Sequence, residues 1–157
     1  MSDSKLSSAF TNPVGASRYG PPLIGALLRM LLDVVRERML ERLHERGFDD
    51  LAAPHLIVLQ YPGPQGMRPS DLAARLRLSK QALNYSLGEL ERLGYIERHP
   101  DPDDLRSRRI AVTPRGDAAA AVIREAVGEI EQEWTRRLGP KRFAELRALL
   151  VELNEPV

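Results

Sequence analysis

The chain has 157 residues, enough for one domain with its own core, and 43% of them are hydrophobic while only 5% are aromatic. It contains no cysteine, which excludes disulfides, thiolate metal ligands and cysteine-based redox sensing. The net charge is +1, and residues 65–115, with 10 Lys and Arg against 7 Asp and Glu, carry the whole positive excess. An excess of three is compatible with an ordinary surface, but it also suits an anionic partner for the middle of the chain.

The first 20 residues are rich in Ser, Asn, Gly and Pro and show no apolar periodicity, which predicts a flexible N-terminal arm. They lack the basic-then-apolar pattern of a secretory signal. The longest apolar run, residues 22–39, contains five charged residues and cannot span a bilayer. We therefore expect a cytoplasmic protein without membrane contacts.

Two helices are predicted in the N-terminal third. The first is long and carries apolar residues on more than one face, which a small monomer can hardly cover. Burial against a second subunit is the expected consequence. The first helix runs from Pro21-Pro22 to about Arg46 and ends at Gly47; the second runs from Ala52 to Tyr61 and ends at the breaker run Pro62-Gly63-Pro64.

The segment from Pro69 to Arg92 predicts two short helices joined by a tight turn. Ser70 and Ser79 are the expected N-caps, and Arg77-Leu78 forms the turn. This arrangement predicts a helix-turn-helix. The residues expected to face inward are Leu72, Ala73 and Leu76 on the first helix and Leu83, Leu87 and Leu90 on the second.

The second short helix has a polar face that points away from its leucines. Asn and Gln side chains on such a face can pair with adenine edges in the major groove, and Lys can pair with guanine or phosphate. A polar helix face is more often simply solvated, so that interpretation stays open. The residues predicted to contact DNA from this helix are Ser79, Lys80, Gln81, Asn84 and Tyr85.

A β-hairpin, or wing, is predicted next, with strands at Tyr95–Arg98 and Arg109–Val112 and a charged loop of ten residues between them. Carboxylates gather at the start of the loop and arginines at its end, so an Asp can brace the loop while an Arg projects from its tip. An Arg on a narrow hairpin can enter the minor groove, where the potential is most negative. The arginines in or beside the wing are Arg98, Arg106, Arg108, Arg109 and Arg115.

Two more helices are predicted after the wing. The first runs from Gly116 to about Leu138, Gly139-Pro140 breaks it, and the second presents leucines on one face. The expected fold class is mainly α with a small β-hairpin. It consists of a winged helix-turn-helix lobe at residues 51–115, with residues 21–50 and 116–157 as a helical dimerisation region.

The runs LSKQALNYSLGELERLGYIER and HPDPDDLRSRRIAVTPRG resemble the MarR family of bacterial winged-helix regulators, and the likeness extends over about residues 21–153. Its motifs are Leu-Glu-x-x-Gly-Tyr-Ile-x-Arg, Asp-x-Arg and Thr-Pro-x-Gly. The resemblance implies a homodimer on a palindromic operator in double-stranded DNA, with Asp104 as the wing aspartate and Arg106 as the minor-groove arginine. Arg108 is expected at a phosphate. Two residues depart from the family pattern: Leu105 stands where a basic residue is common, and Arg77 where the turn often has glycine.

Many members of this family release DNA when a small, often aromatic anion binds between the dimer body and the winged lobe. The resemblance therefore implies a small-molecule effector and places candidate residues for it on three helices. Each candidate also has an ordinary structural explanation, such as core packing for the tryptophan. The candidates are Arg29, Arg36, His55, Leu59, Tyr61 and Trp134.

No metal site is expected, because His44, His55 and His99 are scattered, and no cofactor is expected. An enzyme is not expected either, since the chain has no strand-turn-helix elbow, Gly-rich phosphate loop or His-x-x-His spacing. The hypothesis is a sequence-specific DNA-binding regulator, with repression as the expected outcome. The alternative is a winged-helix dimerisation or adaptor protein that does not read DNA sequence.

Overall fold

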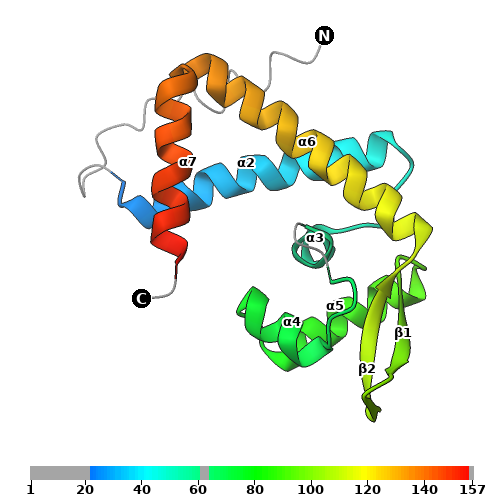
Figure 1. Ribbon diagram of the computed structural model, residues 1–157. Helices are drawn as coiled ribbons and strands as arrows, with labels where there is room; N and C mark the ends of the chain where they lie inside the picture. Colours follow the sequence, from blue (N-terminus) through cyan, green and yellow to red (C-terminus); the bar gives the residue numbers. More distant parts are fainter. Residues whose placement is uncertain (1–21, 61–63, 156–157) are drawn as a thin grey trace. The chain divides into compact units, whose positions relative to one another are not determined.

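The computed structural model describes residues 22–60 and 64–155 (Figure 1). They belong to two compact units, which divide in the chain between Val34 and Val35. The predicted arm at residues 1–20 and the effector candidate Tyr61 lie outside the described residues.

The described part of the chain is mainly helical and contains one two-stranded antiparallel hairpin, which confirms the predicted fold class of a winged helix-turn-helix protein. Each helix expected from the sequence is present. The elements are α2 (Ile24–Glu45), α3 (Ala53–Leu59), α4 (Pro69–Leu76), α5 (Lys80–Arg92), β1 (Ile96–Asp101), β2 (Asp104–Val112), α6 (Pro114–Leu138) and α7 (Pro140–Asn154).

Glycines end the two longest helices, as the sequence predicts. Gly47 after α2 and Gly139 after α6 both have a φ of +82°, which glycine adopts without strain. The start of α6 differs from the prediction, because the helix begins at Pro114 and not at Gly116. Thr113 is its N-cap, and the Thr113 Oγ1 accepts a hydrogen bond from the Gly116 amide at 3.1 Å.

The helix-turn-helix has one predicted cap and one unpredicted cap. The Ser79 Oγ accepts a hydrogen bond from the Ala82 amide at 3.1 Å and caps α5. The prediction that Ser70 caps α4 is wrong. Pro69 occupies the first position of α4, where its fixed φ suits a helix and its missing N–H costs nothing, so Arg68 is the N-cap and Ser70 lies inside the first turn.

The wing is longer and its loop shorter than the sequence predicts. β1 pairs with β2 from Ile96 opposite Val112 to Asp101 opposite Asp104. Only Pro102 and Asp103 remain between the two strands and form the turn, so the predicted ten-residue loop is wrong. The strands continue because backbone pairing satisfies polar groups that a loop would leave to water.

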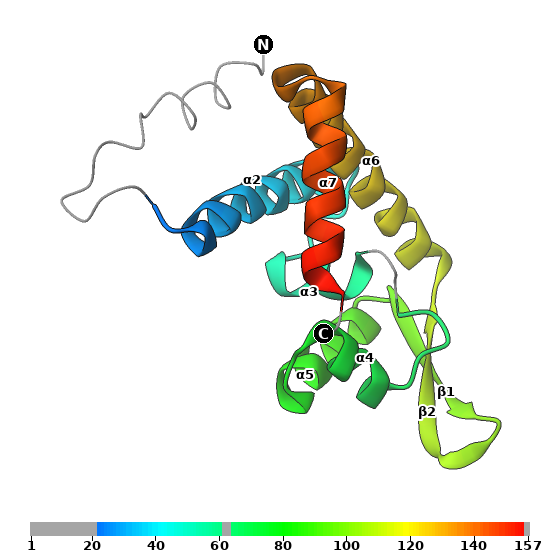
Figure 2. The ribbon, with the colours of Figure 1, turned by 60° about the vertical axis from the view of Figure 1, so that its left-hand side comes forward.

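The hydrophobic core of the unit from Val35 onward joins the C-terminal half of α2 to the winged lobe. Burying a large apolar side chain contributes about 1.5–3 kcal/mol, so this core is the main source of stability. Figures 1 and 2 show α4, α5 and the hairpin together on the side of this unit where α6 begins. The largest fully buried apolar side chains are Tyr95, Met39, Leu43, Leu56, Leu83, Leu87, Leu90, Ile96, Ile110 and Ile130.

Ion pairs line the contact between the C-terminal half of α2 and α6. Three arginines, each four residues apart, face three glutamates with the same spacing, and the order of the pairs shows that the two helices run antiparallel here. The pairs are Arg38 with Glu133 at 3.1 Å, Arg42 with Glu129 at 2.8 Å and Arg46 with Glu125 at 3.2 Å. Partly exposed pairs of this kind contribute little each, and they mainly fix the register of the two helices.

Apolar side chains are exposed at both ends of the described chain. In α7, Leu149 is 52% exposed and Leu153 is 80% exposed, and no residue of that helix is buried. In the unit that ends at Val34, Leu23 and Ile24 are also largely exposed. None of the described helices combines the length and the hydropathy that a membrane-spanning segment needs.

Candidate DNA interface

The five residues predicted to contact DNA from α5 lie together on its exposed surface. Leu83, Leu87 and Leu90 face the core, and Ser86, which the prediction did not include, is buried with them. This burial leaves the other side of the helix to solvent, and Tyr85 is 70% exposed there. The exposed residues are Ser79, Lys80, Gln81, Asn84 and Tyr85.

The polar groups on this surface are available for a ligand. The Ser79 hydroxyl is used by the cap of α5. By contrast, the side chains of Lys80, Gln81, Asn84 and Tyr85 form no hydrogen bond or ion pair with any residue of 22–60 or 64–155. They therefore offer the donors and acceptors that base edges and phosphates pair with.

A buried carboxylate at the end of β1 ties the wing to α4. Asp101 is fully buried, and its Oδ2 lies 2.6 Å from Arg68 Nε and 3.0 Å from Arg109 Nε. Its Oδ1 accepts a hydrogen bond from the Asp103 amide at 3.0 Å. Burial alone would raise the pKa of Asp101, but the Asp103 amide and the guanidinium groups of Arg68 and Arg109 outweigh it and lower the pKa to about 2.

Asp104 holds the returning strand at the wing tip. Its Oδ1 accepts a hydrogen bond from the Arg106 amide at 3.1 Å, and its Oδ2 accepts one from the Ser107 hydroxyl at 2.9 Å. The carboxylate thus fixes the backbone that carries Arg106. The Arg106 guanidinium takes no part in these contacts and is exposed.

The five arginines of the predicted wing region divide into two groups. Three are engaged inside the lobe: Arg98 pairs with Glu91 at 3.1 Å, Arg109 with Asp101 and Asp103, and Arg115 with Asp50 at 2.8 Å. The remaining two, Arg106 and Arg108, are exposed and have no side-chain partner within the described chain. Only these two are available to bind an external anion without breaking an internal contact.

A junction of polar and aromatic groups joins the wing to α6, and it was not predicted from the sequence. The Tyr95 hydroxyl donates a hydrogen bond to Asp50, and the Arg115 guanidinium lies over the Tyr95 ring at 4.5 Å. Burial and the hydrogen bond to Asp50 raise the pKa of Tyr95 to about 12. Gly116 packs directly on the Tyr95 backbone, since a β-carbon at Gly116 would lie 2.1 Å from the Tyr95 carbonyl oxygen.

The candidate effector residues have different surroundings. His55 is buried, and its Nδ1 accepts a hydrogen bond from the Ala52 amide at 3.1 Å; burial, as the largest cause, lowers the pKa of His55. Leu59 belongs to the core and Trp134 is half-buried. Arg29 pairs with the nearby Asp33 at 3.5 Å.

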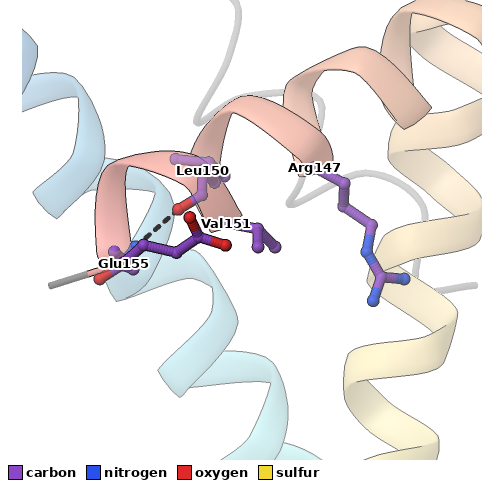
Figure 3. A pocket seen from close by; sticks show the side chains of 5 residues that line it. Arg147, Leu150, Val151 and Glu155 are labelled. Atoms are coloured by element: carbon purple, nitrogen blue, oxygen red, sulfur yellow. Dashed lines mark hydrogen bonds between the residues drawn. The ribbon is translucent and has the colours of Figure 1, made fainter.

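Two hollows on the surface are lined by residues other than these candidates. One lies on α7, where Figure 3 shows Arg147, Leu150, Val151 and Glu155 around it. The other lies between α2 and α6, beside the ion pairs of Arg42 and Arg46. Neither hollow gathers the predicted effector residues, so the effector site stays a prediction. Across the described part of the chain, no three His, Asp or Glu side chains converge as metal ligands.

Comparisons with known proteins agree with this geometry. A protein-family model described as the MarR family matches residues 49–107. The HTH-type transcriptional regulator PecS of Dickeya dadantii (strain 3937) is 29% identical over 132 residues, which cover 82% of this chain and 77% of PecS.

Solved structures resemble this chain over most of its length. The wild-type MarR of E. coli in its apo form has a TM-score of 0.64 and 26% identity, covering 85% of this chain and 98% of that chain. The transcriptional repressor CouR bound to a 23-mer DNA duplex has a TM-score of 0.67 and covers 85% of this chain and 93% of that chain. Its 23% identity shows a shared fold.

Proposed function

We propose that this chain is a DNA-binding transcriptional regulator of the MarR family, which binds a palindromic operator as a homodimer and represses transcription. The family is one of regulators and not of enzymes. The single observation that carries the proposal is the division of the lobe's cations. Arg98, Arg109 and Arg115 hold the lobe together, whereas Arg106 and Arg108 on the braced wing and Lys80 on α5 have exposed side chains without partners in the described residues.

The proposed docking follows from the helix-turn-helix and the wing. α5 enters the major groove, where Gln81 and Asn84 face base edges and Lys80 faces guanine or phosphate. The wing reaches the adjacent minor groove, where Arg106 meets the most negative potential. In a two-fold dimer the two recognition helices would lie about 34 Å apart, one turn of DNA. The CouR structure, which shares this fold, is of the repressor bound to a 23-mer DNA duplex, and this supports duplex binding as the proposed role.

The test begins with selection of a duplex from a randomised library by the wild-type protein, followed by titration of the selected and a scrambled duplex. We expect Arg106→Ala to weaken binding to the selected duplex about tenfold or more. Asn84→Ala should reduce the difference in affinity between the selected and the scrambled duplex, since the loss of one base contact costs about 1–3 kcal/mol of discrimination. Arg108→Ala should weaken both duplexes by a similar factor and lower the salt dependence.

Arg124→Ala is the matched control, because Arg124 is exposed on α6, away from α5 and the wing. It should bind both duplexes as the wild type does. A wild-type protein that binds no duplex at all would favour the alternative, a dimerisation or adaptor protein. Uniform loss for Asn84→Ala and Arg108→Ala would mean that α5 does not read bases.

We also propose that a small aromatic or anionic effector releases the DNA, with Arg29, Arg36, His55, Leu59, Tyr61 and Trp134 as the predicted contacts. The support is the likeness to the MarR family alone, since neither of the two hollows described above is lined by these residues. A screen of small aromatic acids for release of a fluorescent operator tests it. An active compound whose effect is unchanged in Trp134→Ala and Arg36→Ala would contradict this choice of residues.

A further inference from the structure

The turn between α4 and α5 holds an arginine in a backbone conformation that suits glycine. Arg77 has φ +52° and ψ +38°, the left-handed helical region, and no other described residue apart from glycine has a positive φ. The conformation closes α4 through hydrogen bonds from the Arg77 amide to the carbonyl groups of Ala73 and Ala74. Glycine at this position would form the same bonds without strain, because it has no β-carbon.

The Arg77 side chain gives the folded lobe nothing in return for this strain. It is exposed and has no hydrogen bond or ion pair with any residue of the described ranges. Several other arginines of the lobe are engaged: Arg68 with Asp101, Arg92 with Glu89 and Arg98 with Glu91. A strained residue without a structural contact is a reason to look for a contact outside the protein.

The position of Arg77 identifies that contact. It precedes Ser79, the N-cap of α5, by two residues, and Lys80 follows on the exposed face of the helix. The N-terminal turn of a recognition helix enters the major groove, so the residues just before it lie beside the DNA backbone that borders the groove. We propose that Arg77 is a phosphate-binding residue, which adds affinity for any duplex and no preference for sequence. The proposal rests on the proposed function and extends its DNA interface to the turn.

Substitution of glycine separates this role from a structural one, because the two roles predict opposite changes in stability. We expect Arg77→Gly to unfold at a temperature equal to or above that of the wild type. Its affinity for a mixed-sequence 30-base-pair duplex should nevertheless fall about 3- to 10-fold at roughly 100 mM KCl, as expected for one phosphate contact. The slope of log K against log[KCl] should become shallower by about 0.9 for each subunit.

Two variants serve as controls. Arg77→Lys keeps both the charge and the strain and should bind within about twofold of the wild type, since lysine also binds phosphate as a point charge. Arg124→Ala removes an exposed charge elsewhere and should leave the salt slope unchanged. The selected and scrambled duplexes should lose affinity for Arg77→Gly by the same factor.

Three outcomes would overturn the inference. Arg77→Gly could bind mixed-sequence duplex with the wild-type affinity and salt slope, it could lose stability together with affinity, or it could lose affinity for the selected duplex alone. In each case the wild-type protein still binds DNA and the proposed function stands. If the wild-type protein binds no duplex, the proposed function itself fails, and the Arg77 contact fails with it.

Discussion

Gly116 is a residue whose identity the backbone around it dictates. A β-carbon there would lie 2.1 Å from the Tyr95 carbonyl oxygen and 2.7 Å from Val112 Cγ1, and the first of these atoms belongs to backbone that cannot turn away. We predict that Gly116→Ala lowers the free energy of unfolding by about 1–3 kcal/mol, the usual cost of forcing an atom into a packed site. Urea denaturation measures the change.

Gly128 on the same helix supplies the matched control. Nothing lies within 4 Å of a β-carbon built there. Gly128→Ala should therefore stabilise the protein by about 0.5–1 kcal/mol, because alanine is the better residue inside a helix. Equal effects of the two substitutions would contradict the close approach of Gly116 to Tyr95.

His55 makes stability depend on pH. Burial, the largest cause, lowers the pKa of His55 below its ordinary 6.5, and its Nδ1 accepts a hydrogen bond from the Ala52 amide. The unfolded chain therefore binds a proton at a higher pH than the folded one. Stability should be full above about pH 6.5 and decline as the pH falls toward the folded pKa, by at most about 1.4 kcal/mol per pH unit.

The measurement is the free energy of unfolding of the wild type and His55→Gln between pH 5 and pH 7.5. His55→Gln should lose most of this pH dependence, whereas the exposed His99, replaced by Gln, should leave it in place. A decline that persists in His55→Gln would assign it to another group.

The residue types of the site are predictable from the sequence, but their pairing is not. The exposed face of α5 follows from the spacing of Leu83, Leu87 and Leu90 alone. The separation of Arg106 and Arg108 from the other wing arginines depends on partners far along the chain. Arg115, for example, pairs with Asp50, 65 residues away, and no local pattern indicates that contact.

At the scale of the elements, the wing is held near its tip by one carboxylate. Asp101 contacts Arg68 before α4 and Arg109 on β2, so it fixes the hairpin relative to the helix-turn-helix. We predict that Asp101→Asn speeds hydrogen exchange of the hairpin amides and weakens duplex binding about tenfold, comparable to the loss of a wing contact. Hydrogen exchange and DNA titration measure the two effects.

Asp103→Asn is the natural comparison, because the Asp103 side chain is 76% exposed and contributes only an ion pair with Arg109. The hairpin amides of this variant should exchange hydrogen at nearly the wild-type rate, and its affinity for the duplex should be nearly that of the wild type. If both variants behave alike, the buried position of Asp101 has no special role in holding the wing.

The helices and the residues at which they end are predicted best from the sequence, and the residues at which they begin are predicted less well. The breakers Gly47 and Gly139 mark helix ends through their own backbone preferences. Ser70 and Pro69 are both acceptable in the first turn of a helix, so the sequence leaves the start of α4 open. In the structure α4 begins at Pro69. The strands extend beyond their apolar residues because the partners Arg68 and Arg109 bury Asp101 at the end of β1. The residues there are polar, so the alternation of apolar residues that predicts a strand is missing from this part of the sequence.

At the scale of the whole molecule, α7 carries an apolar surface that its own subunit leaves open. Leu149 and Leu153, four residues apart on one face of the helix, are each more than half exposed. Under the proposed dimer, Leu149→Glu combined with Leu153→Glu should give a monomer in sedimentation with unchanged helical content, since neither side chain is buried in the subunit. Operator affinity should fall about 100-fold or more, because the two half-sites are no longer bound together.

The control places the same charges on the other side of the helix. Ala144 and Ala148 are exposed and lie opposite the leucine face by helical spacing. Ala144→Glu combined with Ala148→Glu should remain dimeric. A wild-type protein that sediments as a monomer at micromolar concentration would rule out the dimer directly.

The junction between Tyr95 and the start of α6 has a mechanical consequence. The carbonyl groups of Leu93 and Gly94, at the end of the recognition helix, accept hydrogen bonds from Arg115 and Thr113, so α5 and the first turn of α6 cannot rotate separately. α6 has 25 residues and at 1.5 Å each is about 37 Å long. α6 is therefore a lever arm. If it rotates by about 5° about its far end, the recognition helix moves by about 3 Å, which is close to the 3.4 Å rise of one base pair.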